Sequence, residues 1–237
     1  MIKIKRYYTA LRRYKRSKGF GIHSPFAFNF VLKVLRERCP YYAYDNIHAA
    51  RWQASQLVTS KKERRGLISF KYAKMIFRIT SYFNPQKILQ IGTSHGIVSK
   101  TLLSVSSSSS LYTYLSMGNQ YCIYVQVTDD EASRIFEYDN IEYAVIDYCN
   151  DLAVNEQPFI VINQIDKEAE LIVETAKKAI NAGGVVIICN ISRNHIIKDS
   201  WKAIKSSMSH GMSFSNDKIG VVVGHKHLPL QHYSLWF

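Results

Sequence analysis

The segment KILQIGTSHGIVSK, residues 87–100, brings together residue types that could do chemistry. Gly92, Ser94 and Gly96 form the pattern G-x-S-x-G, which in serine hydrolases places a nucleophilic serine on a sharp turn between a strand and a helix. The same glycine spacing lets a backbone approach a nucleotide closely at the start of a helix. The pattern therefore predicts either a nucleophile at Ser94 or a cofactor-binding loop.

The position of this segment in the chain favours the cofactor loop. A hydrolase of this type carries its nucleophile after several strands and an upstream oxyanion loop. Here the pattern follows the first predicted strand, and no HGGG-like stretch precedes it. A later histidine could serve as the base, but a chain of this size is expected to contain several, as this one does at His195, His210, His225, His227 and His232. We therefore expect a ligand at this loop rather than a serine nucleophile.

From Lys87 onward, short apolar runs alternate with helical patterns. The runs KILQI, LYTYL, EYAVI, PFIVIN, GVVIICN and IGVVVGH predict strands, and helices are predicted over 94–104, 128–136, 167–181 and 199–207. Thr128 and Glu131 form a capping box for the second of these helices. The run CIYVQV fits a strand or a helix. The alternation predicts a doubly wound, mainly parallel α/β sheet, which binds ligands beyond the carboxyl ends of its strands.

The part of the chain before Lys87 predicts helices. Ser24 and Pro25 are typical of an N-cap and a first helical position, and the stretch CPYYAYDNIHAARWQ predicts a turn and a further helix. A helix between Leu67 and Phe83 is predicted to stop at Asn84-Pro85. We expect a basic helical N-terminal region over 1–69, followed by a Rossmann-like domain over 70–237.

The net charge of +13 is distributed unevenly. Residues 1–100 contain 21 Lys and Arg against 3 Asp and Glu, a balance of +18, whereas residues 101–237 contain 10 against 15, a balance of −5. The stretch KIKRYYTALRRYKRSK holds eight basic residues and no acid, with apolar side chains at helical spacing at Ile4, Tyr7, Tyr8, Leu11 and Tyr14. It predicts a basic amphipathic helix whose tyrosine-rich stripe docks on the domain. Nucleic acid, an anionic lipid surface or a phosphorylated glycan is the alternative partner.

Composition excludes several other classes of protein. A hydrophobic content of 47% and a charged content of 21% exclude wholesale disorder. No apolar run approaches the ~20 residues that a transmembrane helix needs. The four cysteines form no C-x-x-C pair, and no apolar signal segment follows the first residues. We therefore expect a cytoplasmic protein with free thiols.

Several segments resemble known methyltransferases. The stretch KILQIGTSHGIVS resembles motif I of S-adenosylmethionine (SAM)-dependent methyltransferases, and GFGIHSPFAF, DSWKAIK and QHYSLWF resemble segments of a bacterial O-methyltransferase-like group. The resemblance implies a class I methyltransferase fold with a seven-stranded sheet and O- or N-methyl transfer to an unidentified acceptor. It also implies that SAM contacts Gln90, Gly92, Thr93, Ser94, Gly96, Leu115, Ser116 and Asn163.

The chain departs from this family where the family binds the cofactor. Gln90 stands where the relatives have an acid at the end of the first strand, and Leu115-Ser116 stands where they have an acid at the end of the second. That second carboxylate accepts both ribose hydroxyl groups, which Leu115 cannot do. Two hypotheses follow: weakened but real SAM binding, or a non-catalytic scaffold or regulatory module that binds an anionic partner through its basic arm.

The remaining candidates concern metal and acid–base chemistry. Neutral residues, Asn163-Gln164 and Cys189-Asn190, stand where the relatives have acids, so carboxylate ligands for Mg²⁺ are missing and we expect no metal. His225 and His227 form H-x-H on a predicted strand without a third ligand, and we interpret them as surface residues. By resemblance His23 lies against the cofactor face. There it is a candidate base for a substrate hydroxyl, or a structural residue that fixes the arm.

Overall fold

The protein is built around an eight-stranded sheet, one strand more than expected. The computed structural model describes residues 11, 13–15, 17–58, 64, 67–92, 94–115, 127–165, 168–193 and 195–237. The strand order is β3-β2-β1-β4-β5-β7-β6-β8. β7 runs antiparallel to both of its neighbours, and all other neighbouring strands are parallel. The strands are β1 (Lys87–Ile91), β2 (Ser110–Tyr114), β3 (Ile135–Tyr138), β4 (Phe159–Ile162), β5 (Val185–Cys189), β6 (Met212–Ser215), β7 (Ile219–Val223) and β8 (Gln231–Ser234).

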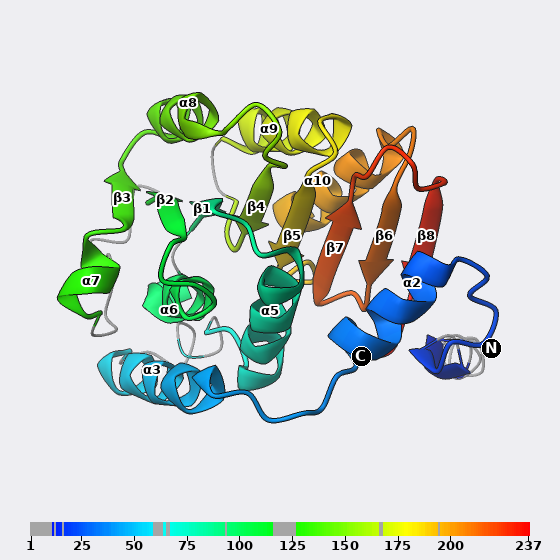
Figure 1. The fold of residues 1–237 in the computed structure, drawn as a ribbon, viewed down its shortest axis with the longest axis horizontal. Helices are drawn as coiled ribbons and strands as arrows, with labels where there is room; N and C mark the ends of the chain where they lie inside the picture. The colour runs from blue at the N-terminus through cyan, green and yellow to red at the C-terminus, as the bar shows by residue number, and fades with distance from the viewer. Residues whose placement is uncertain are drawn as a thin grey trace.

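Helices cover both faces of this sheet (Figure 1). One face carries α2 (Pro25–Phe30), the π-helical turn η1 (Val31–Leu35), α3 (Ala43–Leu57), α5 (Phe70–Phe83) and α6 (Ile97–Leu103). The other carries α8 (Ile141–Asp151), α9 (Ala169–Asn181) and α10 (His195–Ser206). The short helix α7 (Asp129–Ala132) precedes β3. None of the helices in the described ranges is long and apolar enough to cross a membrane.

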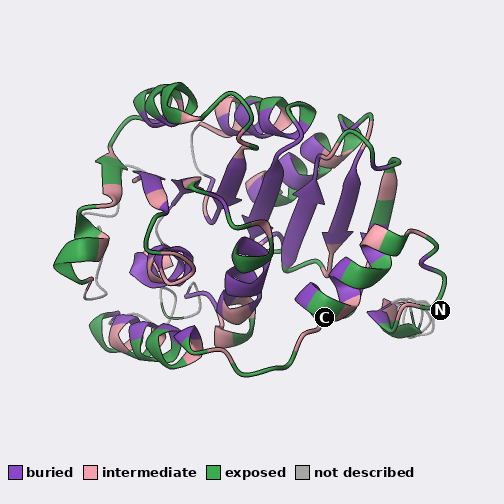
Figure 2. Cartoon of the chain, viewed as in Figure 1, coloured by how far each residue is buried: buried purple, intermediate pink, exposed green. Residues whose placement is uncertain are grey.

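Two hydrophobic cores result, one on each face of the sheet. Ile88 and Val161 belong to the core beneath α3, α5 and α6, whereas their chain neighbours Leu89 and Ile160 belong to the core beneath α8, α9 and α10. Side chains alternate between the two faces of a strand, so a strand buried on both sides needs an unbroken apolar run. β4, β5 and β7 are such runs and are buried along their whole length (Figure 2).

The N-terminal arm is fastened to the other end of the chain. Ser17 is fully buried; its Oγ accepts a hydrogen bond from the backbone N–H of Trp236 at 2.5 Å, and its carbonyl accepts one from Arg36 at 2.7 Å. Arg13 forms an ion pair with Asp217. These contacts place the described part of the arm at the end of the sheet where β8 leaves it.

The tyrosine-rich stripe of the arm is exposed where the structure describes it. Leu11 is 53% exposed and Tyr14 is 46% exposed, contrary to the expectation that the stripe docks on the domain. Ile4, Tyr7 and Tyr8 lie outside the described residues. Hydrogen bonds at Ser17, rather than the apolar stripe, therefore hold this part of the arm.

The order of helix and strand after α7 differs from the prediction. EYAVI, predicted as a strand, lies within α8, and the predicted helix over 128–136 ends early because β3 begins at Ile135. In α8 the buried residues are Ile141, Ala144 and Tyr148, which follow a helical period that the apolar run obscured. The capping box of Thr128 and Glu131 is confirmed. The run CIYVQV lies outside the described residues except for Val127.

The sequence interpretation missed β6, whose four residues MSFS contain two serines. It pairs with β7 on one side and β8 on the other, so the predicted strand IGVVVGH, which contributes β7, does not lie beside β8. A short strand of mixed polarity is hard to recognise from the sequence. β6 is buried because α2 packs on it, with the Phe30 ring centre 5.0 Å from that of Phe214.

Three tyrosines on the α8 side of the sheet predict loss of stability at high pH. Burial, with Asp147 as hydrogen-bond acceptor, raises the pKa of Tyr138 from 10.0 to about 12, and burial also raises the pKa values of Tyr112 and Tyr148. A folded-state pKa above the unfolded value contributes stability that is present below the unfolded pKa and lost as pH rises through the folded pKa. We expect the free energy of unfolding to fall between about pH 10 and about pH 12.

This expectation is checked by urea unfolding, followed by circular dichroism, in wild type and Tyr138→Phe. The variant removes one titrating phenol, so its stability should decline less steeply with pH than that of the wild type. Identical slopes in the two proteins would contradict the assignment of Tyr138. The comparison of slopes cancels the titration of lysines, which both proteins share.

Candidate functional site

The loop after β1 has an unusual backbone. Gly92 and Gly96 have φ values of 78° and 82°, and between them Ser94 and His95 have φ values of 48° and 57°. Residues other than glycine rarely adopt these left-handed backbone angles, and the residues that do so concentrate at functional sites. Thr93 lies outside the described residues. The loop therefore occupies a strained conformation at the carboxyl end of β1, where the sequence predicted a ligand.

Amide side chains hold this loop in place. The carbonyl oxygen of Gly92 accepts hydrogen bonds from Nε2 of Gln90 at 3.0 Å and from Nδ2 of Asn163 at 2.8 Å. Oε1 of Gln90 in turn accepts a hydrogen bond from Ser99 Oγ at 3.0 Å. Both ends of the fully buried Gln90 amide are thus used inside the protein. Gln90 therefore holds the loop in place, and Ser99 orients the Gln90 amide. The sequence analysis did not identify Ser99.

Gly92 is required by packing as well as by its backbone angle. A Cβ atom at this position would lie 2.8 Å from Cβ of Gln164, closer than real Cβ atoms approach one another. Gln164 follows Asn163 at the end of β4, so the loop after β1 and the end of β4 are in direct contact. Gly92 thus allows the loop after β1 to pack closely against the end of the adjacent strand β4.

Three buried polar atoms at this edge have no hydrogen-bond partner among the described residues: Ser94 Oγ, Asn163 Oδ1 and Thr113 Oγ1. Thr113 on β2 is the register partner of Gln90 on β1. A buried polar atom without a partner costs about 1–3 kcal/mol, so such atoms are expected to meet a ligand or a water molecule. Ser94 and Asn163, which follow neighbouring strands, therefore carry polar atoms whose hydrogen-bonding capacity the described residues leave unused.

The position expected to hold the ribose is apolar. Leu115 directly follows β2, is half-buried, and donates its backbone N–H to the carbonyl of Tyr138 at 2.8 Å. Its side chain offers no acceptor to a sugar hydroxyl. Ser116 lies outside the described residues. The described part of the second strand therefore supplies no carboxylate to a nucleoside.

His23 is not brought to this loop. The adjacent Ser24 caps α2 and donates a hydrogen bond to the sulfur of Met212, the first residue of β6. Because β6 runs parallel to β1, Met212 lies at the amino edge of the sheet, whereas Gly92 lies at the carboxyl edge. His23 is exposed at the amino edge and is not positioned to act as a base beside the loop.

The serine nucleophile lacks its base. Ser94 Oγ has no hydrogen-bond partner in the described ranges, so no described histidine ring lies within hydrogen-bond reach of it. A nucleophilic serine is recognised by that contact and by a third group that orients the base. The described residues around Ser94 therefore do not form the contacts of a catalytic serine.

Metal ligands do not gather at the ends of β4 and β5. Across the ranges that the structure describes, no three His, Cys, Asp or Glu side chains form a group that could hold a metal ion. Burial raises the pKa of Cys189 to about 12, which keeps its thiol protonated. His225 and His227 lie in the turn after β7 rather than on a strand, and the His225 ring packs against Phe83.

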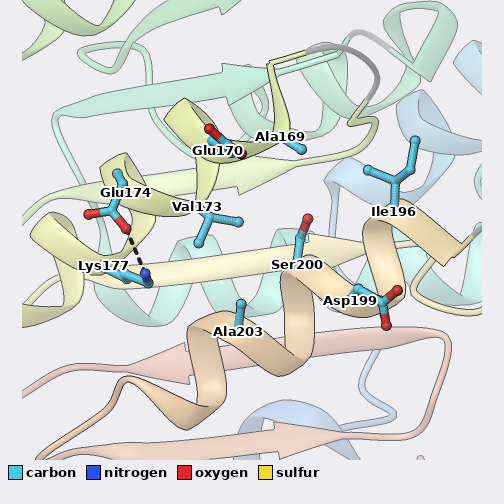
Figure 3. Close-up of a pocket in the computed structure, with 9 residues that line it drawn as sticks. All are labelled: Ala169, Glu170, Val173, Glu174, Lys177, Ile196, Asp199, Ser200 and Ala203. Carbon is cyan, nitrogen blue, oxygen red and sulfur yellow. Dashed lines mark hydrogen bonds and ion pairs between the residues drawn. The ribbon is translucent and has the colours of Figure 1, made fainter.

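A hollow lies between α9 and α10, on the face of the sheet that α8, α9 and α10 cover (Figure 3). It has a volume of about 490 Å³, and none of the residues predicted to bind the cofactor lines it. Glu174 in this groove pairs with Lys177 at 2.6 Å. The groove is therefore separate from the loop after β1.

Comparison with known proteins identifies the fold. No protein-family model matches the sequence, and no curated protein is significantly similar to it. Among solved structures, a protein provisionally identified as a caffeoyl-CoA O-methyltransferase from Staphylococcus aureus superposes with a TM-score of 0.51 and 13% identity, over 83% of this chain and 97% of that one.

Two further neighbours have ligands bound. An O-methyltransferase from Bacillus cereus in complex with S-adenosylhomocysteine (SAH) gives a TM-score of 0.49 at 14% identity, over 81% of this chain and 96% of that one. The O-methyltransferase TomG from Streptomyces achromogenes in complex with SAM gives 0.49 at 14% identity, over 90% and 97%. With the strand order 3-2-1-4-5-7-6 extended by β8, the chain has the Rossmann-like fold of class I methyltransferases.

Proposed function

We propose that this protein binds SAM at the loop after β1 and transfers its methyl group to an oxygen or nitrogen nucleophile. The observation that carries the proposal is the pair of buried acceptors without partners, Ser94 Oγ and Asn163 Oδ1, on either side of the constrained Gly92. Ligands of open α/β sheets bind at this edge. An ammonium or amine group of the ligand would supply the missing donors.

The residues present fit such a ligand in part. Gln90 and Asn163 both donate to the carbonyl of Gly92 and so hold the loop in one conformation before any ligand arrives. A preorganised loop lowers the cost of binding. Leu115, however, offers nothing to the ribose hydroxyls, and the missing hydrogen bonds to a charged acceptor reduce affinity by about 1.5–3 kcal/mol. We therefore expect weak binding, with Kd between about 1 µM and about 1 mM.

The proposed reaction depends on position rather than on strong acids or bases of the loop. Bound SAM supplies an electrophilic methyl group, and the protein's residues hold it and exclude water. Asn163-Gln164 and Cys189-Asn190 provide amides and a protonated thiol in place of carboxylates, so the proposed transfer proceeds without a divalent metal. Correct placement of two reactants contributes a large part of the acceleration in reactions of this kind.

Calorimetric titration with SAM and SAH, followed by transfer of a labelled methyl group to panels of small hydroxyl and amine acceptors, tests the proposal. Binding at micromolar to millimolar concentration together with labelled product supports it. Binding without any transfer leaves the non-catalytic alternative, a scaffold that keeps the cofactor site for regulation. Absence of binding at millimolar SAM and SAH contradicts the proposal in both forms.

A further inference from the structure

A cationic cavity opens near the end of η1, away from the loop after β1. It has a volume of about 360 Å³ and is bordered by the end of η1, by α5 and by Trp236 and Phe237. Five basic side chains line it, accompanied by one acid, Glu37: Arg36, Arg38, Lys71, Lys74 and Arg78. Cavities of this size accommodate small organic molecules.

The described residues neutralise the positive charge in this cavity only in part. None of the five basic side chains forms an ion pair with any described residue. Oε1 of Glu37 accepts hydrogen bonds from the backbone N–H groups of Arg38 at 2.6 Å and Cys39 at 2.8 Å, so this carboxylate stabilises its own turn. A terminal carboxylate at Phe237 would raise the number of anions at the cavity to two, with Glu37, against five basic side chains.

Arg78 is the most constrained of these cations, since its residue is only 8% exposed. Its guanidinium donates to the carbonyls of Val34 at 2.7 Å and Leu35 at 3.1 Å and to the hydroxyl of Tyr44 at 3.1 Å. All three acceptors are neutral, and two of the five N–H groups have no acceptor among the described residues. Hydrogen bonds to its carboxylate chiefly lower the pKa of Glu37, and the charge of Arg78 makes a smaller contribution. The two groups form no ion pair, so an anion in the cavity would add to a partial compensation of this buried charge.

The basic arm cannot supply this anion. Residues 1–36 contain no Asp or Glu, so the part of the arm outside the described residues can only add to the positive potential. At the edge of the cavity, a hydrogen bond with Lys18 and the charge of Lys18 lower the pKa of the Tyr14 phenol, with smaller contributions from the charges of Arg36 and Arg38. Glu37 is the one acid among the described residues that line this cavity, so an anionic ligand would supply charge that the described lining does not.

Apolar and aromatic surfaces complete the cavity. Leu35 and Met75 are buried and line it, and Tyr14 and Trp236, which are 46% and 57% exposed, stand where it meets solvent. Aromatic faces bind flat organic groups and cations well, whereas a bare inorganic ion gains nothing from them. The cavity thus combines an anion-binding surface with a surface for an organic body.

We infer that this cavity binds the phosphate monoester of a small aromatic or apolar compound. A phosphate carries up to two negative charges and three acceptor oxygens, which match several cations better than one carboxylate does. The inference goes beyond the proposed function and does not depend on it, because none of the residues that line the cavity belongs to the loop after β1.

Titration of the full chain with phenyl phosphate, inorganic phosphate and phenol tests the inference by calorimetry. Phenyl phosphate should bind about tenfold more tightly than inorganic phosphate, and phenol should give no binding heat. The double variant Lys71→Gln, Lys74→Gln should weaken binding of phenyl phosphate by about tenfold or more, while Lys202→Gln, an exposed lysine paired with Asp199 on α10, should change nothing. Equal affinity in the double variant and the wild type overturns the inference, as does no binding at millimolar concentration.

Trp236→Phe locates the ligand even if the double variant fails to fold. In the wild type, phenyl phosphate bound beside Trp236 should change the tryptophan fluorescence. The variant should keep its affinity for phenyl phosphate but should no longer show this change. If the variant shows the same fluorescence change as the wild type, the ligand lies elsewhere and the inference is overturned. Sedimentation with vesicles that contain phosphatidic acid separates the two sources of a phosphate monoester. Binding to vesicles through Lys71 and Lys74 without binding of phenyl phosphate would make the cavity a lipid headgroup site and overturn the small-molecule assignment.

Discussion

Replacing Leu115 by glutamate is expected to tighten the binding of SAH by about ten- to a hundredfold. The change places a carboxylate at the end of β2, where the ribose of a ligand at the Gly92 loop is expected. A carboxylate accepts hydrogen bonds from both ribose hydroxyls, and hydrogen bonds to a charged group contribute about 1.5–3 kcal/mol. Leu115 is half-buried, so the variant should lose some stability. Calorimetry with SAH measures the gain in affinity.

Leu115→Gln is the matched control for this variant. It has nearly the size of glutamate and one neutral acceptor, so its gain should be clearly smaller than that of Leu115→Glu. Both variants are checked by thermal unfolding to separate affinity from stability. If the two variants bind SAH no better than the wild type, the ribose does not lie at Leu115 and the assignment of this position is wrong.

Replacing Asn163 by leucine is expected to weaken SAH binding by about ten- to a hundredfold. The change removes the donor that holds the carbonyl of Gly92 at 2.8 Å and the buried Oδ1 acceptor that has no partner in the described structure. Among the described residues, Gln90 remains as the single side-chain donor to that carbonyl. Loss of a buried hydrogen bond costs about 1–3 kcal/mol, and we expect a similar loss of folding stability.

Asn163→Asp separates the two roles of this side chain. Aspartate keeps the acceptor oxygens but cannot donate to the carbonyl of Gly92 when ionised. If contact with the ligand dominates, Asn163→Asp should retain more affinity for SAH than Asn163→Leu. If the position of Gly92 dominates, both variants should bind equally weakly. Wild-type affinity in Asn163→Leu would contradict any role of Asn163 in the site.

The sheet was predictable from the sequence because most of its strands are buried on both faces. Runs such as VVIIC have no polar interruption, and this pattern together with the short length and β-branched residues is typical of a central strand of a covered sheet. The edge region was not predictable in the same way. β3 is partly exposed and β6 contains two serines, so neither had a continuous apolar run. In α8 the apolar run EYAVI was assigned to a strand, and only contact with the sheet reveals its helical face.

The candidate site was predictable in its position but not in its hydrogen bonds. The glycine spacing located the loop after β1, since a strand-to-helix turn needs residues that accept left-handed backbone angles. That Gln90 is used entirely inside the protein depends on Ser99, nine residues away, and could not be read from spacing. The resemblance placed His23 beside the cofactor face. In the structure the start of α2 lies beside Met212, so the adjacent His23 is at the amino edge of the sheet, opposite the loop after β1.

Nuclear magnetic resonance of the labelled protein during titration with SAH tests the central claim most directly. The account predicts that the backbone amides of Gly92, Ser94 and Leu115 and the side-chain amide of Asn163 shift progressively at micromolar to millimolar SAH. Amides around Arg78, in the separate cationic cavity, should not shift. Absence of shifts at the Gly92 loop at millimolar SAH, or saturable shifts confined to another part of the molecule, would contradict the assignment of this loop as a cofactor site.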